Sequence, residues 1–481
     1  MVISSIPALF LAFLLATPSA LQPASGDGGP VITHHPVDQL GRGQDMVVEA
    51  TVTGPRPIIR VSLAYQVGDR FGDAPLLQTT PSTWRTRVPA SRFDRNFTYI
   101  LHATDAGGRV STWPSAAAGA PAHQVTLTDA QNDAAPAARG DQHLLYVAVP
   151  GVRNYAEFGG VGVVVFDIAD GHRFVKRIPT LGVPEGLEPE NVKGVALSVP
   201  LGLLYVTTPK RMIALDLTTE RVVWNREYDG GCDRMALSPD GTILYVPSLE
   251  GPHWHAVDAR TGDVIRRIDT NSGAHNTIYG LDGARVYLAG LRSPLLNVAD
   301  PRTHTVVKRI GPFGNVIRPF TVNGRQTLCF VNVNGLLGFE VGDLQTGKML
   351  HRVEVQGHRG GPVKRHGCPS HGIGLTPDES EVWVADAANS SMHVFDATVM
   401  PPKQVASIRV RDQPGWITFS LDGKYAYPST GDVIDTKTRR IVTGLTDELG
   451  RAVQSEKVVE AIYSGGKLVR AGDQFGLGRK Q

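Results

Sequence analysis

Cysteine is scarce in this chain, which holds three in 481 residues: Cys232, Cys329 and Cys368. The number is odd and the three are far apart in sequence, so no disulfide framework is implied. There is no Cys-x-x-Cys-His motif either, which leaves a covalently attached haem without support. Aromatic residues make up only 7% of the chain, and they offer no obvious platform for stacking nucleobases.

An excess of charge of one sign is also missing. The 48 lysines and arginines nearly balance the 46 aspartates and glutamates, which leaves a formal net charge of +2. Proteins that bind nucleic acids or other polyanions through bulk charge are usually strongly basic. We therefore expect no nucleic-acid partner.

Long apolar runs are absent except at the N-terminus, where residues 6–16 form a run of 11. This run is too short to cross a bilayer comfortably, and small residues follow it up to Ala20. We interpret residues 1–20 as a secretory signal peptide, with an uncleaved anchor as the alternative. The expected protein is secreted or periplasmic, without a membrane span once the signal is removed.

What the chain does contain is a repeat. Seven apolar segments each end in an aspartate, and the steps between these aspartates are 49, 42, 42, 43, 53 and 39 residues. A period of ~40–45 residues with strand-like content indicates a β-propeller with one blade per repeat. We expect the aspartates to form turns rather than to act as catalytic acids, because most have threonine three positions later. They are Asp167, Asp216, Asp258, Asp300, Asp343, Asp396 and Asp435.

The repeats share further features. An Asp-Gly or Asn-Gly turn, as in residues 238–241, precedes a Tyr-Val strand, as in residues 244–246. This pattern resembles the YVTN-repeat β-propellers of the YncE type, a family of secreted bacterial proteins, over residues ~143–465. The resemblance implies an all-β, seven-bladed β-propeller, which we place at residues 141–470. Members are mostly binding or surface proteins, and related rings include lactonases and lyases. We expect residues 457–462 to complete a blade begun at residues 144–147.

Residues 30–128 differ from the repeats. Alternating strand patterns at 46–52, 59–65 and 97–103 are separated by turn clusters, and about seven short strands would fit. The segment loosely resembles the fibronectin-III or immunoglobulin-like modules of secreted bacterial proteins, so we expect a small β-sandwich. Residues 129–140 are rich in alanine, aspartate and proline and are interpreted as a linker.

The candidate site follows from the repeat. In a propeller the innermost strands begin at one mouth of the central channel, and counting back from each turn locates these starts. The positions that should read apolar instead hold ionisable or polar groups, which is typical of a ligand site. The predicted ligand-binding residues are Lys193, Asp233, Arg234, Asn276, Arg318 and Trp416. The alternative is a water-filled channel whose side chains only bond to one another.

Histidines suggest two more roles. His275 and His371 occupy equivalent positions in two repeats, and either could serve as a catalytic base. The 53-residue step contains an inserted loop with His358, His366 and Cys368. Imidazole suits zinc or copper, so we also consider a divalent metal held by His275, His371 and His366, although no known ligand spacing is matched. A solvated loop is the simpler alternative.

The expected function is binding or scaffolding outside the cytoplasm, with a small molecule, a carbohydrate or a cell-surface protein as partner. The alternative is a lyase or hydrolase that acts on an anionic sugar or lactone, with or without a metal. No Gly-x-Ser-x-Gly elbow, phosphate loop, dinucleotide fingerprint or His-Glu-x-x-His motif occurs. These absences disfavour serine hydrolases, nucleotide enzymes and common metalloproteases.

Overall fold

The structure is a computed structural model that describes residues 28–41, 45–115, 121–128, 141–181, 183, 187–363 and 365–480. The predicted signal peptide, 1–20, and linker, 129–140, lie outside these residues. The chain divides into two compact units, Met1–Ala134 and Ala135–Gln481. The all-β class is confirmed, because the described regular structure is almost entirely strand, with short 3-10 turns at Ala90–Arg92 and Ala156–Phe158.

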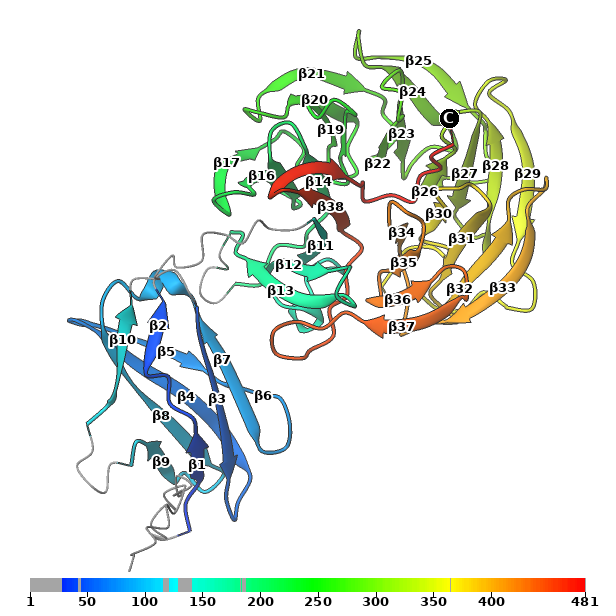
Figure 1. Ribbon diagram of the computed structural model, residues 1–481. Helices are drawn as coiled ribbons and strands as arrows, with labels where there is room; N and C mark the ends of the chain where they lie inside the picture. Colours follow the sequence, from blue (N-terminus) through cyan, green and yellow to red (C-terminus); the bar gives the residue numbers. More distant parts are fainter. Residues whose placement is uncertain are drawn as a thin grey trace, which may run out of the picture. The chain divides into compact units, whose positions relative to one another are not determined.

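The first unit is built from two sheets. One has the strand order β1-β3-β7-β6, and the other has the order β2-β10-β8-β4-β5 with β9 added to β8 (Figure 1). Its described strands number ten, rather than the seven or so expected. They are β1 (Val31–His34), β2 (Gln39–Gly41), β3 (Met46–Thr53), β4 (Ile58–Val67), β5 (Arg70–Pro75), β6 (Leu77–Gln78), β7 (Thr83–Val88), β8 (Phe97–Asp105), β9 (Val110–Trp113) and β10 (His123–Thr128).

The alternation of buried and exposed side chains along the strands explains why the two sheets pack face to face. In β3 every second side chain, beginning with Met46, is buried, and β8 follows the same period from Phe97 onward. Side chains alternate across a strand, so each sheet presents one apolar face. Residues of both sheets, among them Val48, Leu63 and Leu101, join one core.

The second unit contains seven antiparallel sheets, six of them four-stranded. Their strands are β14 (Gly194–Ser198), β15 (Leu203–Thr207), β16 (Arg211–Asp216), β17 (Arg221–Glu227), β18 (Ala236–Leu237), β19 (Ile243–Pro247), β20 (His253–Asp258), β21 (Val264–Asp269), β22 (Ala274–Tyr279), β23 (Val286–Gly290), β24 (Leu296–Asp300), β25 (Thr305–Ile310), β26 (Ile317–Val322), β27 (Leu328–Val333), β28 (Gly338–Asp343), β29 (Met349–Glu354), β30 (Ile373–Leu375), β31 (Glu381–Asp386), β32 (Ser391–Asp396), β33 (Lys403–Arg409), β34 (Ile417–Phe419), β35 (Tyr425–Pro428), β36 (Asp432–Asp435) and β37 (Arg440–Gly444).

The remaining sheet joins the two ends of this unit. It has five strands in the order β13-β12-β11-β38-β39, namely β13 (Arg173–Ile178), β12 (Gly162–Asp167), β11 (Gln142–Val149), β38 (Val458–Ser464) and β39 (Lys467–Ala471). The pairing of β11 with β38 confirms that the chain ends complete one sheet. Figure 1 shows the seven sheets side by side around a common centre, with β14, β18, β22, β26, β30 and β34 innermost.

The seven evenly spaced aspartates are turn residues, as expected. Each is the last residue of the third strand of its sheet, from Asp167 of β12 to Asp435 of β36. The Asp216 carboxylate, for example, accepts hydrogen bonds from the backbone N–H groups of Thr218 and Thr219 at 2.9 and 2.7 Å. Such Asx turns fix the entry into the outermost strand, which is the structural role expected of these aspartates.

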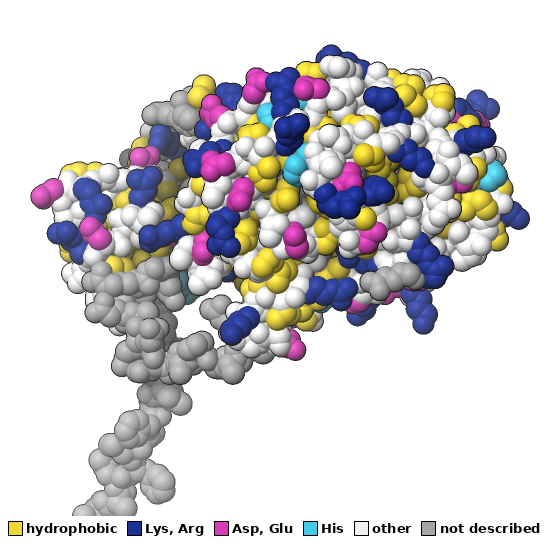
Figure 2. Space-filling model, turned by 90° about the horizontal axis from the view of Figure 1, so that it is seen from above, with side chains coloured by type: hydrophobic (Ala, Val, Ile, Leu, Met, Phe, Trp, Pro, Cys, Tyr) yellow, Lys and Arg dark blue, Asp and Glu magenta, His cyan; other side chains and the backbone are white. Residues whose placement is uncertain are grey.

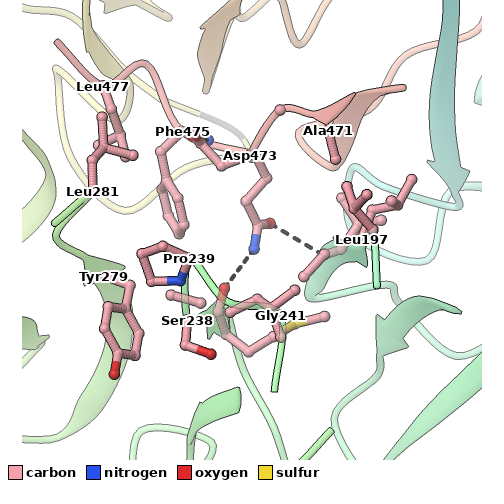
Figure 3. A pocket seen from close by; sticks show the side chains of 18 of the residues that line it. Leu197, Ser238, Pro239, Gly241, Tyr279, Leu281, Ala471, Asp473, Phe475 and Leu477 are labelled. Carbon is pink, nitrogen blue, oxygen red and sulfur yellow. Dashed lines mark hydrogen bonds between the residues drawn. The ribbon is translucent and has the colours of Figure 1, made fainter. Parts of the chain in front are cut away.

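The second unit extends beyond residue 470, the end predicted from the sequence, because the C-terminal tail, residues 472–480, packs against it. The tail runs across the ends of several innermost strands: Thr418 Oγ1 donates to the Phe475 carbonyl at 2.8 Å, and the Leu375 N–H donates to the Gly476 carbonyl at 2.9 Å. Figure 3 shows Phe475 and Leu477 of the tail beside Pro239 and Leu281, around a cavity of about 150 Å³. The tail therefore covers this end of the innermost strands with apolar side chains.

Candidate functional site

A cavity of about 230 Å³ lies at the other end of the innermost strands, where these strands begin. Its ionisable lining comes from inner-strand starts and from adjoining loops. These residues are Arg153, Lys193, Asp233, Arg234, Glu250, His275, Arg318, Arg365, His366, His371, Glu456 and Lys457. Six cationic side chains therefore face three carboxylates and three histidines. On the face shown in Figure 2, by contrast, acidic and basic side chains are interspersed.

The structure brings together seven of the nine residues proposed from the sequence: Lys193, Asp233, Arg234, His275, Arg318, His366 and His371. The remaining two do not line the cavity. Asn276 follows His275 on β22, where successive side chains alternate between faces, and it is 2% exposed. Trp416 lies under Arg234, whose guanidinium carbon is 3.4 Å from the ring centroid. Trp416 thus supports a lining residue instead of lining the cavity itself.

Asp233 organises one side of the cavity. Its carboxylate accepts a hydrogen bond from His275 Nδ1 at 2.6 Å and lies 3.4 Å from Lys193 Nζ. Burial alone would raise the pKa of Asp233, but His275 and Lys193 outweigh burial and hold that pKa below its usual range. With Nδ1 committed to an ionised partner, the Nε2 atom of His275 is the ring nitrogen left to interact with a ligand.

Glu456 organises the other side. Its Oε2 accepts from Arg234 Nη2 at 2.7 Å and from Lys457 Nζ at 2.8 Å, and its Oε1 lies 3.3 Å from His366 Nδ1. Burial alone would raise the pKa of Glu456, yet Lys457, His366 and Arg234 bring it well below its ordinary value. Burial lowers the pKa of Lys457 to about 8, although Glu456 partly offsets this. This carboxylate is therefore ionised and heavily hydrogen bonded.

His366 and His371 stack against each other, with ring centroids 4.9 Å apart. His371 Nδ1 donates to the Gly415 carbonyl at 3.0 Å, and His366 Nε2 donates to the Gln413 carbonyl at 3.1 Å. Burial, reinforced by His366, lowers the pKa of His371 well below its usual value. Ligand atoms of His366, His371 and Glu456 lie within 4.8 Å of one another. The triad expected from sequence had His275 in place of Glu456; His275 bonds to Asp233 instead.

The inserted loop contains a cysteine as well as histidines. The Cys368 thiol donates to the Ser370 carbonyl at 3.0 Å. Burial raises the pKa of Cys368 to about 12, so it is not a thiolate ligand at neutral pH. The loop is also not a solvated excursion throughout, because His366 is 7% exposed and reaches the cavity.

Sequence reasoning missed several lining residues, chiefly Glu456 and Lys457, and also Arg153, Asn191 and Glu250. Glu456 and Lys457 immediately precede β38, which is the inner strand of the shared sheet. The same counting that located Lys193 and Asp233 would have reached them, had it been extended to the tail. Arg153 and Glu250 lie in loops between second and third strands, where the sequence offers many polar residues and no way to choose.

Buried polar atoms without partners occur beside the cavity. Among the described residues, Arg234 Nε and Nη1 have no hydrogen bond, and neither do the two side-chain amide atoms of Asn276. In the described part of the chain, Arg318 forms no ion pair; its guanidinium donates to the Asn334 side chain and to the Gly367 carbonyl. Buried donors without acceptors are rare in proteins and indicate a site that water or a ligand completes.

Comparisons with known proteins place the chain in no family. No protein-family model matches it, and no curated protein matches it. Among solved structures it is similar to the hydrazine synthase of Kuenenia stuttgartiensis, with 12% identity and a TM-score of 0.37 over 56% of this chain and 100% of that one. A likeness at this level says nothing about activity or ligand. In the described residues, no helix has the length and apolarity needed to span a membrane.

Proposed function

We propose that the second unit is a seven-bladed β-propeller of the YVTN-repeat type that binds a small anionic ligand, bearing a carboxylate, in the cavity at one mouth of its channel. The arrangement in Figure 1 and the shared sheet support the ring. The excess of cationic over anionic side chains in a mostly buried cavity carries the ligand assignment. Drug-sized ligands occupy roughly 300–1,000 Å³, so a cavity of 230 Å³ suits a smaller molecule.

The cationic side chains are placed to hydrogen bond to a bound carboxylate, and not only to attract an anion from a distance. Arg318 has no acidic partner in the described chain, and two nitrogen atoms of Arg234, Nε and Nη1, have no hydrogen bond to the described residues. Lys193 reaches the cavity from the start of β14, and only 18% of its side chain is exposed. A carboxylate placed among these groups would satisfy donors that water otherwise must solvate, which is how buried polar sites gain affinity and specificity.

Calorimetric titration of the full chain with glucuronate, with glucose as the neutral counterpart, tests this proposal. We expect glucuronate to bind and glucose not to bind. Lys193→Met should weaken binding roughly tenfold to hundredfold, the usual cost of losing a hydrogen bond to a charged group. Lys308→Met removes a lysine on β25, outside the cavity, and should change nothing. Equal binding of both sugars, or equal effects of both variants, would refute an anion site.

A lyase is the second candidate, favoured by the Asp233–His275 pair. Nε2 of His275 could take the proton next to a carboxylate while Lys193 holds that carboxylate; the C–H electron pair would then form a double bond and expel the β-oxygen substituent. Polygalacturonate turnover is measured by the absorbance of the unsaturated product. His275→Gln should lower the rate roughly 10²–10⁴-fold. No product from the unaltered protein rules out this substrate class.

We further propose that the protein is exported through the signal peptide at residues 1–20 and acts in the periplasm or outside the cell. The apolar run of residues 6–16, followed by small residues, supports this. The intact mass of the protein purified from its native host would reveal removal of those residues. A mass that includes Met1 would contradict export by cleavage.

A further inference from the structure

Three side chains from two segments far apart in the sequence meet at the cavity. His366 and His371 belong to the loop between β29 and β30, and Glu456 precedes β38. One ligand atom of each lies within 4.8 Å of the others, and His366 Nδ1 is 3.3 Å from Glu456 Oε1. Two ligands of a tetrahedral zinc, each at about 2.0–2.2 Å, lie roughly 3.3–3.5 Å apart. The distance between His366 Nδ1 and Glu456 Oε1 falls in that range.

The tautomers follow from the hydrogen bonds. His371 donates from Nδ1 to Gly415, so its Nε2 carries a lone pair. His366 donates from Nε2 to Gln413, so in the neutral ring Nδ1 carries a lone pair that faces an ionised carboxylate oxygen. Two lone pairs at 3.3 Å repel unless a cation lies between them. That cation is either a proton on His366 or a metal ion.

The surroundings favour the metal ion. Metal-bound histidines almost always donate their second nitrogen to a carbonyl or carboxylate, and ligating carboxylates are themselves hydrogen bonded. Both histidines have such a carbonyl, and Glu456 has Arg234 and Lys457 on Oε2, which leaves Oε1 free toward the histidines. A proton on His366 would account for the short distance between His366 Nδ1 and Glu456 Oε1, but it would give the lone pair of His371 no partner.

We propose that His366, His371 and Glu456 form a divalent transition-metal site, with zinc best matched to two imidazoles and one carboxylate. Three protein ligands leave a fourth position open, as in catalytic rather than structural zinc sites. That position faces the cavity, since all three ligands line it. A bound zinc would add positive charge to the anion site, but it rests on a separate set of side chains from Lys193 and Asp233.

The experiment uses the full chain, treated with EDTA, dialysed and titrated with Zn²⁺ against a chromophoric chelator. We expect one Zn²⁺ per chain. His366→Ala and His371→Ala should each lower the affinity by more than the roughly 10–100-fold cost of losing an outer-shell partner. His358→Ala is the matched control, because His358 belongs to the same loop but bonds to the Gln356 carbonyl. No Zn²⁺ uptake, or an equal loss in the control, overturns the proposal.

A second measurement needs no variant. Co²⁺ added to the metal-free protein should give the intense visible absorption of a four-coordinate site, and Zn²⁺ should abolish it by displacement. The weak absorption of six-coordinate Co²⁺ would overturn the proposed geometry. Glucuronate binding is measured separately on the EDTA-treated protein, so failure of the anion site and failure of the metal site give different results.

Discussion

The two ends of the innermost strands differ sharply in chemistry. At their starts the strands present Lys193, Asp233, His275 and His371 to a cavity. At their far ends the same strands present Leu197, Leu237 and Tyr279, and the tail covers these with Phe475 and Leu477 (Figure 3). One set of strands therefore carries an open polar mouth at one end and a closed apolar end at the other.

The two ends of these strands therefore contribute differently to stability and to binding. The covered end buries apolar area and pairs backbone groups, which stabilises the unit. The open end keeps several charges partly desolvated, which costs stability unless each charge is paired. Trp416 connects the two ends: its indole N–H donates to the Gln474 carbonyl at 2.7 Å, and its face carries Arg234. Because the two ends otherwise use different residues, substitutions at the covered end should mainly change stability, and substitutions at the open end should mainly change binding.

Phe475→Ala should have the largest effect on stability. Phe475 is 6% exposed and belongs to the main core cluster of the second unit, so its removal leaves a cavity and costs about 3 kcal/mol of the free energy of unfolding. Glucuronate affinity should not change, because the site is at the other end. Urea unfolding is followed by hydrogen exchange of peptides from residues 142–471, which reports on this unit by itself.

Two further variants serve as comparisons for Phe475→Ala, one for stability and one for binding. Val442→Ala on β37 shortens a side chain that is 53% exposed, and it should stay within about 0.5 kcal/mol of the parent. Lys193→Met at the polar mouth should weaken glucuronate binding and should cost less stability than Phe475→Ala, because the buried Asp233 carboxylate keeps its hydrogen bond from His275. If Phe475→Ala weakened binding as much as Lys193→Met, the two ends would be coupled and the separation argued above would be wrong.

Much of this fold could be predicted because it repeats. A period marked by Asp216, Asp258 and their equivalents depends on local turn chemistry, which sequence shows directly. The pairing of β11 with β38 was predictable too, because the first repeat begins at its second strand and otherwise lacked an inner strand. The tail was not predictable: Phe475 and Leu477 are two apolar residues among glycines, and only the ring around them gives them a surface to cover.

Prediction of the site residues from the sequence was limited in the same way, to positions that a local pattern marks. Lys193, Asp233 and His275 could be placed because each lies near the start of an inner strand, at a fixed distance from a turn. Asn276 was misplaced because a one-residue step in a strand reverses the direction of the side chain. Glu456 was missed because it precedes β38, which is far in sequence from the repeat that β38 completes; its partners Arg234 and His366 are also 222 and 90 residues away.

Effects smaller than that of Phe475→Ala are expected from two aspartates, one at each end of the innermost strands. The pKa of Asp233 is lowered, since His275 and Lys193 outweigh burial, whereas burial raises the pKa of Asp473 more than Arg479 lowers it. A lowered folded pKa contributes stability above the unfolded pKa of about 3.9, and this stability is lost as pH falls through the folded value. A raised folded pKa has the opposite sign: stability falls as pH rises from about 3.9 through the folded value.

Replacing each aspartate by asparagine should therefore shift stability in opposite directions. Asp233→Asn should cost about 2 kcal/mol at pH 7, because Lys193 and His275 lose their charged partner, and less near pH 3. Asp473→Asn should be neutral or slightly stabilising at pH 7, since the isosteric amide removes a carboxylate that burial disfavours. Urea unfolding at both pH values measures this. Equal losses of stability from both variants would mean that Arg479 stabilises the Asp473 carboxylate as much as Lys193 and His275 stabilise that of Asp233. The two ends would then not differ in how they stabilise a buried carboxylate.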